Sequence, residues 1–145
     1  MAFRFALETV LRVRSVIEER EERLLKNILY EVSQARESLV RTEHEIAEVN
    51  QLRQAEVFKP FTGLDLQASY GHLSDLKQRK NESEAQLTKL EQLRARQMTV
   101  YERARQNREM LTNMREDKLT AFETSESRRE QQVLDDTFAA RKSRR

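Results

Sequence analysis

Apolar residues recur every three or four positions along the first third of the chain, which predicts a long α-helix with one apolar face. The steps alternate between four and three residues, except at Leu24, Ile28 and Val32, where two steps of four follow each other. Such a stutter locally unwinds a coiled coil without ending it. We therefore expect a partnered helix over about residues 3–57. Its seam consists of Phe3, Leu7, Val10, Arg14, Ile17, Glu21, Leu24, Ile28, Val32, Ala35, Leu39, Thr42, Ile46 and Val49, of which eleven are apolar.

The pattern breaks once, at the only proline of the chain, Pro60, which is followed by Gly63. Proline disfavours helix at the residue before it and cannot continue the helical hydrogen bonds. Glycine adds backbone freedom, and Thr62 and Asp65 have the spacing of a capping box that opens a helix. We therefore predict a turn at about residues 58–62.

A less regular apolar stripe follows the turn and predicts a second helix over about residues 63–140, ahead of a basic tail at 141–145. A helix that returns beside the first one needs to reach only roughly position 118 at about 1.5 Å per residue. The remainder of the second helix therefore overhangs the pairing and needs another partner. The stripe consists of Leu66, Tyr70, Leu73, Leu76, Leu87, Leu90, Leu93, Val100 or Tyr101, Ala104, Leu111, Met114, Leu119 and Phe122, and the overhang carries Phe122, Val133, Leu134 and Phe138.

These elements predict an all-α fold in which residues 1–145 form one long antiparallel two-helix coiled-coil hairpin. A straight dimer of long helices is the alternative that the pattern leaves open. The composition agrees with a narrow seam: 36% of residues are charged, against roughly 25% in an average domain. Intrinsic disorder is the competing interpretation, but the scarcity of proline and glycine and the sustained periodicity argue against it.

The composition also excludes several classes of protein. The chain has no cysteine, so it has no disulfide and no thiolate metal site. Its apolar runs are far shorter than the 18 or so residues that cross a bilayer, and its start does not resemble a signal peptide. We therefore expect a soluble cytoplasmic protein without membrane insertion.

No residue pattern indicates catalysis. The chain lacks phosphate-binding glycine loops and metalloprotease motifs, and its two histidines, His44 and His72, are expected at the surface. Five arginines surround Tyr101 in the stretch at 94–108, but interleaved carboxylates argue against a nucleic-acid partner. We therefore predict a protein that is not an enzyme, binds no cofactor or metal, and recognises other proteins through its helix faces.

The chain resembles the FliJ family of flagellar export proteins. The resemblance is carried by the opening "FRFALETVLRVR", by the Glu/Arg-rich helix after it, by "ASYGHLSDL" after the turn and by the ending "LDDTFAARKSRR". It implies a hairpin similar to the central stalk subunit of rotary ATPases. It also implies three partners: the hexameric flagellar export ATPase, whose assembly the family promotes, the cytoplasmic domain of the membrane export gate, and export chaperones. The location implied is the cytoplasm, peripheral to the export apparatus of the inner membrane.

The resemblance also implies two groups of contact residues. The residues expected to contact the export gate are Val49, Tyr70, Leu73 and Leu76. Those expected to contact the ATPase ring are Phe5, Leu7, Val10, Leu11, Leu134, Asp135, Phe138 and Arg141. Thr42 and Glu45 stand where the family often has larger apolar residues, so the first-helix half of the gate surface departs from the family pattern.

Two other hypotheses stay open at this point. One is the injectisome (YscO-like) counterpart of the same protein, and the other is a purely structural coiled coil that associates with itself through the same seam.

Overall fold

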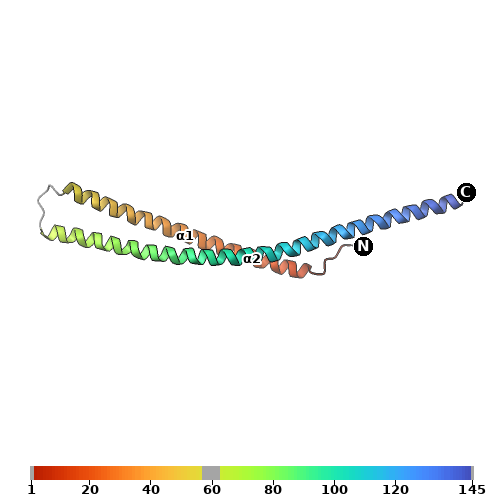
Figure 1. Cartoon of the computed structure of the whole chain (residues 1–145), viewed down its shortest axis with the longest axis horizontal. Coiled ribbons are helices and arrows are strands. Elements are labelled where there is room, and N and C mark those ends of the chain that lie inside the picture. Colours follow the sequence, from red (N-terminus) through yellow and green to blue (C-terminus); the bar gives the residue numbers. More distant parts are fainter. Residues whose placement is uncertain (1, 57–62, 145) are drawn as a thin grey trace. The chain divides into compact units, whose positions relative to one another are not determined.

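The computed structural model describes residues 2–56 and 63–144 and consists of two long helices (Figure 1). Helix α1 spans Glu8–Glu56 and helix α2 spans Gly63–Ser143, and the described residues contain no strand. The predicted all-α hairpin is therefore confirmed, with a 49-residue and an 81-residue helix. The turn predicted at 58–62, with Pro60 and Thr62, lies outside the described residues.

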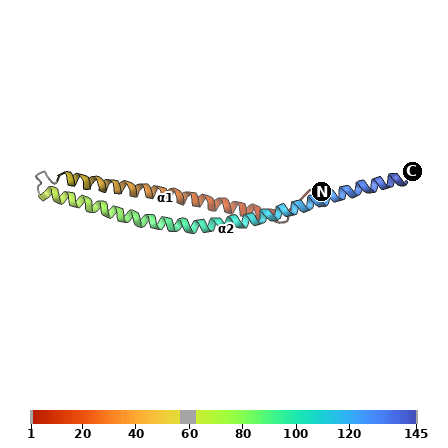
Figure 2. The same ribbon diagram turned by 45° about the horizontal axis from the view of Figure 1, so that its top comes forward.

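The two helices pack antiparallel in each of two compact units. The tip unit is formed by residues 21–100, and the end unit by residues 1–20 with 101–145. In the tip unit, Arg36 of α1 contacts Glu91 of α2. Arg53, which comes later in α1, lies over Tyr70, which comes earlier in α2. The same order holds in the end unit. There Phe3 contacts Phe122, and Glu18, which comes later in the chain than Phe3, contacts Arg108, which comes earlier in α2 than Phe122. The side-by-side course of α1 and α2 within the tip unit is visible in Figures 1 and 2.

The core is a single seam between the helices, and its register differs from the predicted one at two places. Leu25 is buried at 6% exposure, whereas Leu24 is 42% exposed. Likewise, Leu11 is half-buried while Val10 is exposed. With Leu25 in place of Leu24, the two consecutive steps of four fall at Ile17, Glu21 and Leu25, so the stutter lies one step earlier than predicted. Both errors fall on adjacent apolar residues, where spacing alone does not decide which one faces the partner helix. The buried core residues are Phe5, Leu25, Val32, Leu73, Leu76, Leu90 and Ala104.

Helix α1 begins at Glu8, not near residue 3 as predicted. The residues before it lie outside the helix, where Phe3 packs against α2 and Phe5 is buried. The Glu8 N–H donates to the Phe5 carbonyl at 3.2 Å, and the Phe5 side chain is buried. The Phe3 and Phe122 ring centroids lie 5.7 Å apart. Phe122 therefore belongs to the paired part of α2 and not to the overhang, which begins after it.

Candidate functional site

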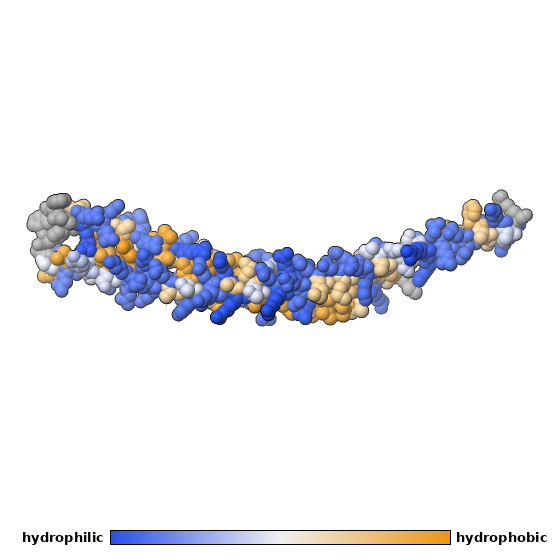
Figure 3. All heavy atoms as spheres, viewed as in Figure 1, coloured by the Kyte–Doolittle hydropathy of each residue, from blue (hydrophilic) through white to orange (hydrophobic). Residues whose placement is uncertain are grey.

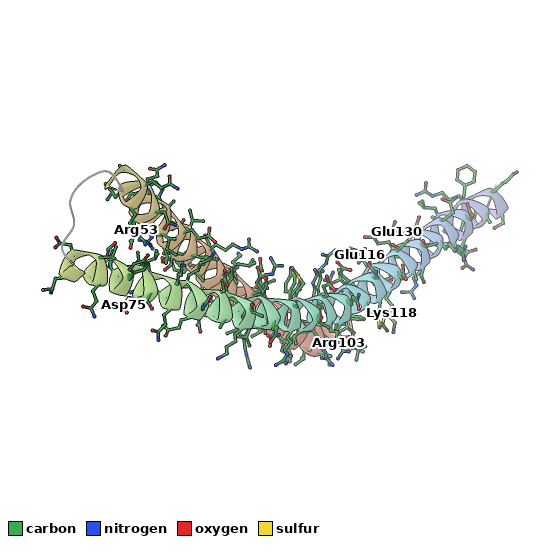
Figure 4. All side chains as sticks on the ribbon, turned by 60° about the vertical axis from the view of Figure 1, so that its left-hand side comes forward. Arg53, Asp75, Arg103, Glu116, Lys118 and Glu130 are labelled. Atoms are coloured by element: carbon green, nitrogen blue, oxygen red, sulfur yellow. The ribbon has the colours of Figure 1, made fainter. Side chains whose placement is uncertain are left out.

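Exposed apolar side chains occur at the end of α1 and at the start of α2. Tyr70 is 53% exposed, and the Arg53 guanidinium lies 4.1 Å from the centre of its ring, within the range of a cation–π contact. Figure 4 places Arg53 at the end of α1, beside the first turns of α2. We call the exposed set Leu52, Leu64, Leu66 and Tyr70 the tip patch.

The structure divides the residues predicted to contact the export gate between the seam and the surface. Leu73 and Leu76 are buried between the helices, and Val49 is half-buried. Tyr70 is the one member of that set that is exposed. The structure does not bring the four together as one accessible surface, although their function as contacts stays a prediction.

The tip patch contains residues that the sequence analysis did not assign to a contact surface. Leu52 and Leu64 are large apolar residues close to the predicted turn, and this nearness was the available signal. An apolar side chain near the end of a two-helix hairpin has too few neighbours to be enclosed, so it is displayed. Arg53 carried no comparable signal, because its contact with Tyr70 depends on the pairing of the helices.

The residues predicted to contact the ATPase ring lie in two separate places in the end unit. Phe5 is buried, Leu7 and Leu11 are half-buried, and Val10 is exposed. The second group begins twelve residues beyond Phe122 along α2, or roughly 18 Å at the helical rise. The structure thus does not join the two groups, whose contact with an ATPase remains a prediction. Leu134, Asp135, Phe138 and Arg141 form the second group.

The second group belongs to a helical segment without a partner in the end unit. We call residues 123–144 the C-terminal arm; every residue from 127 to 144 is exposed. Leu134 is 64% and Phe138 74% exposed, and Val133 is also open to solvent. In Figure 1 this part of α2 continues beyond the start of α1, and Figure 3 shows hydrophobic groups near its end on a largely hydrophilic surface. Such a display of large apolar side chains indicates a surface that another molecule covers.

Polar side chains of α2 meet carboxylates of α1 along the paired length. In the end unit, Arg108 donates to both carboxylate oxygens of Glu18, at 2.6 and 3.1 Å. In the tip unit, Gln97 donates to the Glu21 carboxylate at 2.5 Å and to its backbone carbonyl at 3.1 Å. Charged and polar groups at seam positions favour one register over others, because a slipped register leaves them unpaired. Two further bridges of this kind are Arg115–Glu8 and Arg36–Glu91.

Two of these contacts shift the pKa of one of their members in the stabilising direction. The hydrogen bond with Glu18 raises the pKa of Arg108, and the hydrogen bond from Arg36 lowers the pKa of Glu91. A carboxyl whose pKa is lower in the folded state stabilises the fold above its ordinary pKa of 4.5. That contribution is lost as the pH falls through the lowered value. Acid therefore weakens this contact, while neutral and moderately basic pH keep it.

Removing the Glu18–Arg108 bridge is expected to reduce the free energy of unfolding more than removing an exposed pair. A double-mutant cycle with Glu18→Ala and Arg108→Ala should give a coupling of about 1 kcal/mol, because the pair is bidentate and its Glu18 side chain is only 16% exposed. The exposed pair Arg105–Glu109 is the matched control and should give about 0.4 kcal/mol. Urea denaturation followed by circular dichroism measures both cycles. Equal coupling energies for the two pairs would contradict the expectation that the seam bridge stabilises the fold more than an exposed pair does.

The tip unit also contains a groove of about 670 Å³ between the helices. It forms where small side chains occupy the interface, among them Ala35, Ser38 and Ser83. None of its lining residues is buried, so the groove does not exclude water. Within residues 2–56 and 63–144, no group of three or more His, Cys, Asp or Glu side chains could hold a metal ion. Neither described helix contains a stretch that is long and apolar enough to cross a membrane.

The sequence model of the family described as "Flagellar FliJ protein" matches residues 3–145, which is nearly the whole chain. No curated protein and no solved structure matches.

Proposed function

The chain belongs to the FliJ family and so has a role related to flagellar protein export, and we propose that within the export apparatus it is a stalk. In this proposal the end unit enters the centre of the export ATPase hexamer and promotes its assembly, while the tip patch contacts the cytoplasmic domain of the export gate. The chain thereby links the two machines. It also binds export chaperones, and its place is the cytoplasmic side of the inner membrane.

The C-terminal arm carries this proposal. It is a helical segment of about 20 residues in which positions 127–144 are all exposed, whereas most helical stability in proteins comes from packing an apolar face against a partner. Its large apolar residues, Val133, Leu134 and Phe138, lack a protein neighbour to bury them. The inside of a ring offers such neighbours on all sides of a single helix. Burial there supplies the stability that the arm does not have alone.

The chemistry of ATP hydrolysis belongs to the partner in this proposal. The chain contributes contact surfaces and a stiff connection, and we propose that it uses no cofactor and no catalytic group. The groove in the tip unit supports this proposal, because it is lined mainly by polar and charged side chains and none of its lining residues is buried.

The link to the gate is assigned to the exposed tip patch in place of the buried leucines. Tyr70 and Leu66 are accessible, and Arg53 holds the Tyr70 ring in place through its cation–π contact. Aromatic side chains with one face supported and the other open are frequent centres of protein interfaces. Leu73 and Leu76 support this surface from beneath by fixing the start of α2 against α1.

Affinity capture from the native bacterium, with the tagged chain as bait, tests the proposal as a whole. Recovery of the flagellar export ATPase and the gate supports the stalk. Recovery of an injectisome ATPase instead assigns the chain to that related system, and recovery of the chain alone or of nucleic acid contradicts the proposal.

The substitution Tyr70→Asp is expected to weaken binding to the purified gate domain at least about tenfold, because a central aromatic contact is replaced by a charge. Helix content should stay unchanged, since the side chain is half exposed. Surface-immobilised gate domain with the chain in solution provides the measurement. Tyr30→Asp is the matched control: Tyr30 is an exposed tyrosine in the middle of α1, and binding should be retained. Unchanged binding by the Tyr70 variant would remove the tip patch from the proposal.

A further inference from the structure

One face of the C-terminal arm has an ordered distribution of charge. Residues on this face follow each other at steps of three and four, as they do on one side of an α-helix. The face is acidic at its start, apolar at its centre and basic at its end. Figure 4 shows Glu130 on this segment, where α2 continues without α1 beside it. In chain order the face consists of Glu123, Glu126, Glu130, Val133, Leu134, Thr137, Arg141 and Arg144.

This order is self-complementary when the face is turned end to end. If a two-fold axis passes between Val133 and Leu134, Val133 of one copy faces Leu134 of the second copy, and Leu134 of the first faces Val133 of the second. The same axis places Glu126 opposite Arg141, and Glu123 opposite Arg144. In both pairs a carboxylate therefore faces a guanidinium of opposite charge. Each pair occurs twice because the interface is symmetric. Phe138 lies beside the apolar centre and extends it.

We propose that the free protein forms an antiparallel dimer in which the C-terminal arms of two copies pair through this face. A parallel pairing is disfavoured because it would place Glu123 and Glu126 against themselves and Arg141 and Arg144 against themselves. Like charges at facing helix positions are destabilising, whereas opposite charges at such positions set the orientation of coiled-coil partners.

The arm as it stands in one copy has the properties that this pairing requires. Val133, Leu134 and Phe138 are exposed, and so are Glu123, Arg141 and Arg144. Glu126 forms a pair with Arg129 at 3.3 Å within its own helix, at a spacing worth only a few tenths of a kcal/mol. That weak contact can be exchanged for one across the dimer. Pairing also packs the apolar centre of this face, which is the main source of helix stability in proteins.

The dimer has a regulatory consequence if the stalk function also holds. The same apolar residues cannot be covered by a second copy and by an ATPase ring at once, so the dimer would be a storage form that must separate before the arm enters a ring. The dimer itself does not depend on that function, and its test uses no other protein.

Sedimentation equilibrium of the full chain over about a hundredfold range of concentration, at low salt, tests the proposal. We expect a monomer–dimer equilibrium. Glu123→Arg with Glu126→Arg should weaken the dimer at least about 30-fold, since four ion pairs become like-charge contacts. Arg141→Glu with Arg144→Glu should have the same effect.

Two recombinations of these variants make the test specific. The chain that carries all four substitutions should dimerise again, and an equimolar mixture of the two double variants should form a heterodimer. The control Asp135→Asn with Asp136→Asn lies on the other side of the arm and should leave the dimer unchanged. Circular dichroism verifies that each variant keeps the hairpin.

Any of three results would overturn the proposal. The first is a monomeric wild-type chain at all concentrations, which would leave the arm to a different partner. The second is a dimer that both double variants form as well as the wild type does. The third is a pair of double variants that fail to associate with each other, because this would exclude the antiparallel register.

Discussion

Replacing Leu76 by aspartate is expected to lower the free energy of unfolding by about 4 kcal/mol or more and to unfold much of the tip unit. Leu76 is 1% exposed, and no other described residue reaches this degree of burial with so large a side chain. The substitution removes its apolar contacts and places a carboxylate in the seam without a partner. A two-helix hairpin has only one seam, so no second layer compensates for the loss. Thermal and urea denaturation, followed by circular dichroism at 222 nm, a wavelength sensitive to helix, measures the effect.

Leu52→Asp is the matched control for this experiment. Leu52 is also a leucine near the turn, but it is 60% exposed, so its replacement should change the stability by about 0.5 kcal/mol or less. A stable, fully helical Leu76→Asp variant would contradict the seam described above. The result also bears on binding assays: loss of gate binding by a Leu76 variant reports unfolding, whereas loss by a Tyr70 variant reports a contact.

The substitutions Leu134→Asp with Phe138→Asp are expected to reduce the affinity for the export ATPase at least about a hundredfold, because two large apolar anchors are lost from the same short helix. The stability of the hairpin should not change, since both side chains are exposed and neither contacts α1 in the described residues. Titrating the chain into ATPase subunits and counting hexamers by mass photometry gives the affinity.

Two controls separate this effect from others. Tyr70→Asp changes a residue of the tip unit and leaves the arm unaltered, so this variant should still promote hexamers. Glu123→Arg with Glu126→Arg opens the proposed dimer while keeping both apolar anchors, so any gain in ring assembly from that variant comes from dimer dissociation. An ATPase that assembles equally well with the Leu134 and Phe138 variant would show that the arm is not the ring-binding segment.

The sequence predicted the architecture well because a heptad pattern and a single proline are strong local signals. The start of α2 at Gly63 and the existence of an overhang both follow from them. The length of α1 sets how much of α2 can pair with it. The Phe3–Phe122 contact lies close to the predicted end of the pairing, near residue 118.

The same signals did not predict which residues are accessible. Periodicity identifies an apolar stripe but not the exposure of its members, so Leu73 and Leu76 appeared as surface contacts although they are core residues. The choice between Leu24 and Leu25 depends on side chains that lie more than 60 residues away in the sequence. The start of α1 was wrong for a similar reason: Phe3 and Phe5 leave the helix for contacts with α2 that no local pattern encodes.

The unequal lengths of α1 and α2 have a mechanical consequence. Where the helices are paired, bending requires one of them to be stretched and the other compressed, and the seam resists their sliding because its charged bridges fit one register. Beyond Phe122 a single helix carries the load and bends far more readily. Within the end unit, a stiff paired segment therefore continues into a compliant single helix, and a force applied along or around it is absorbed first in the last 20 or so residues.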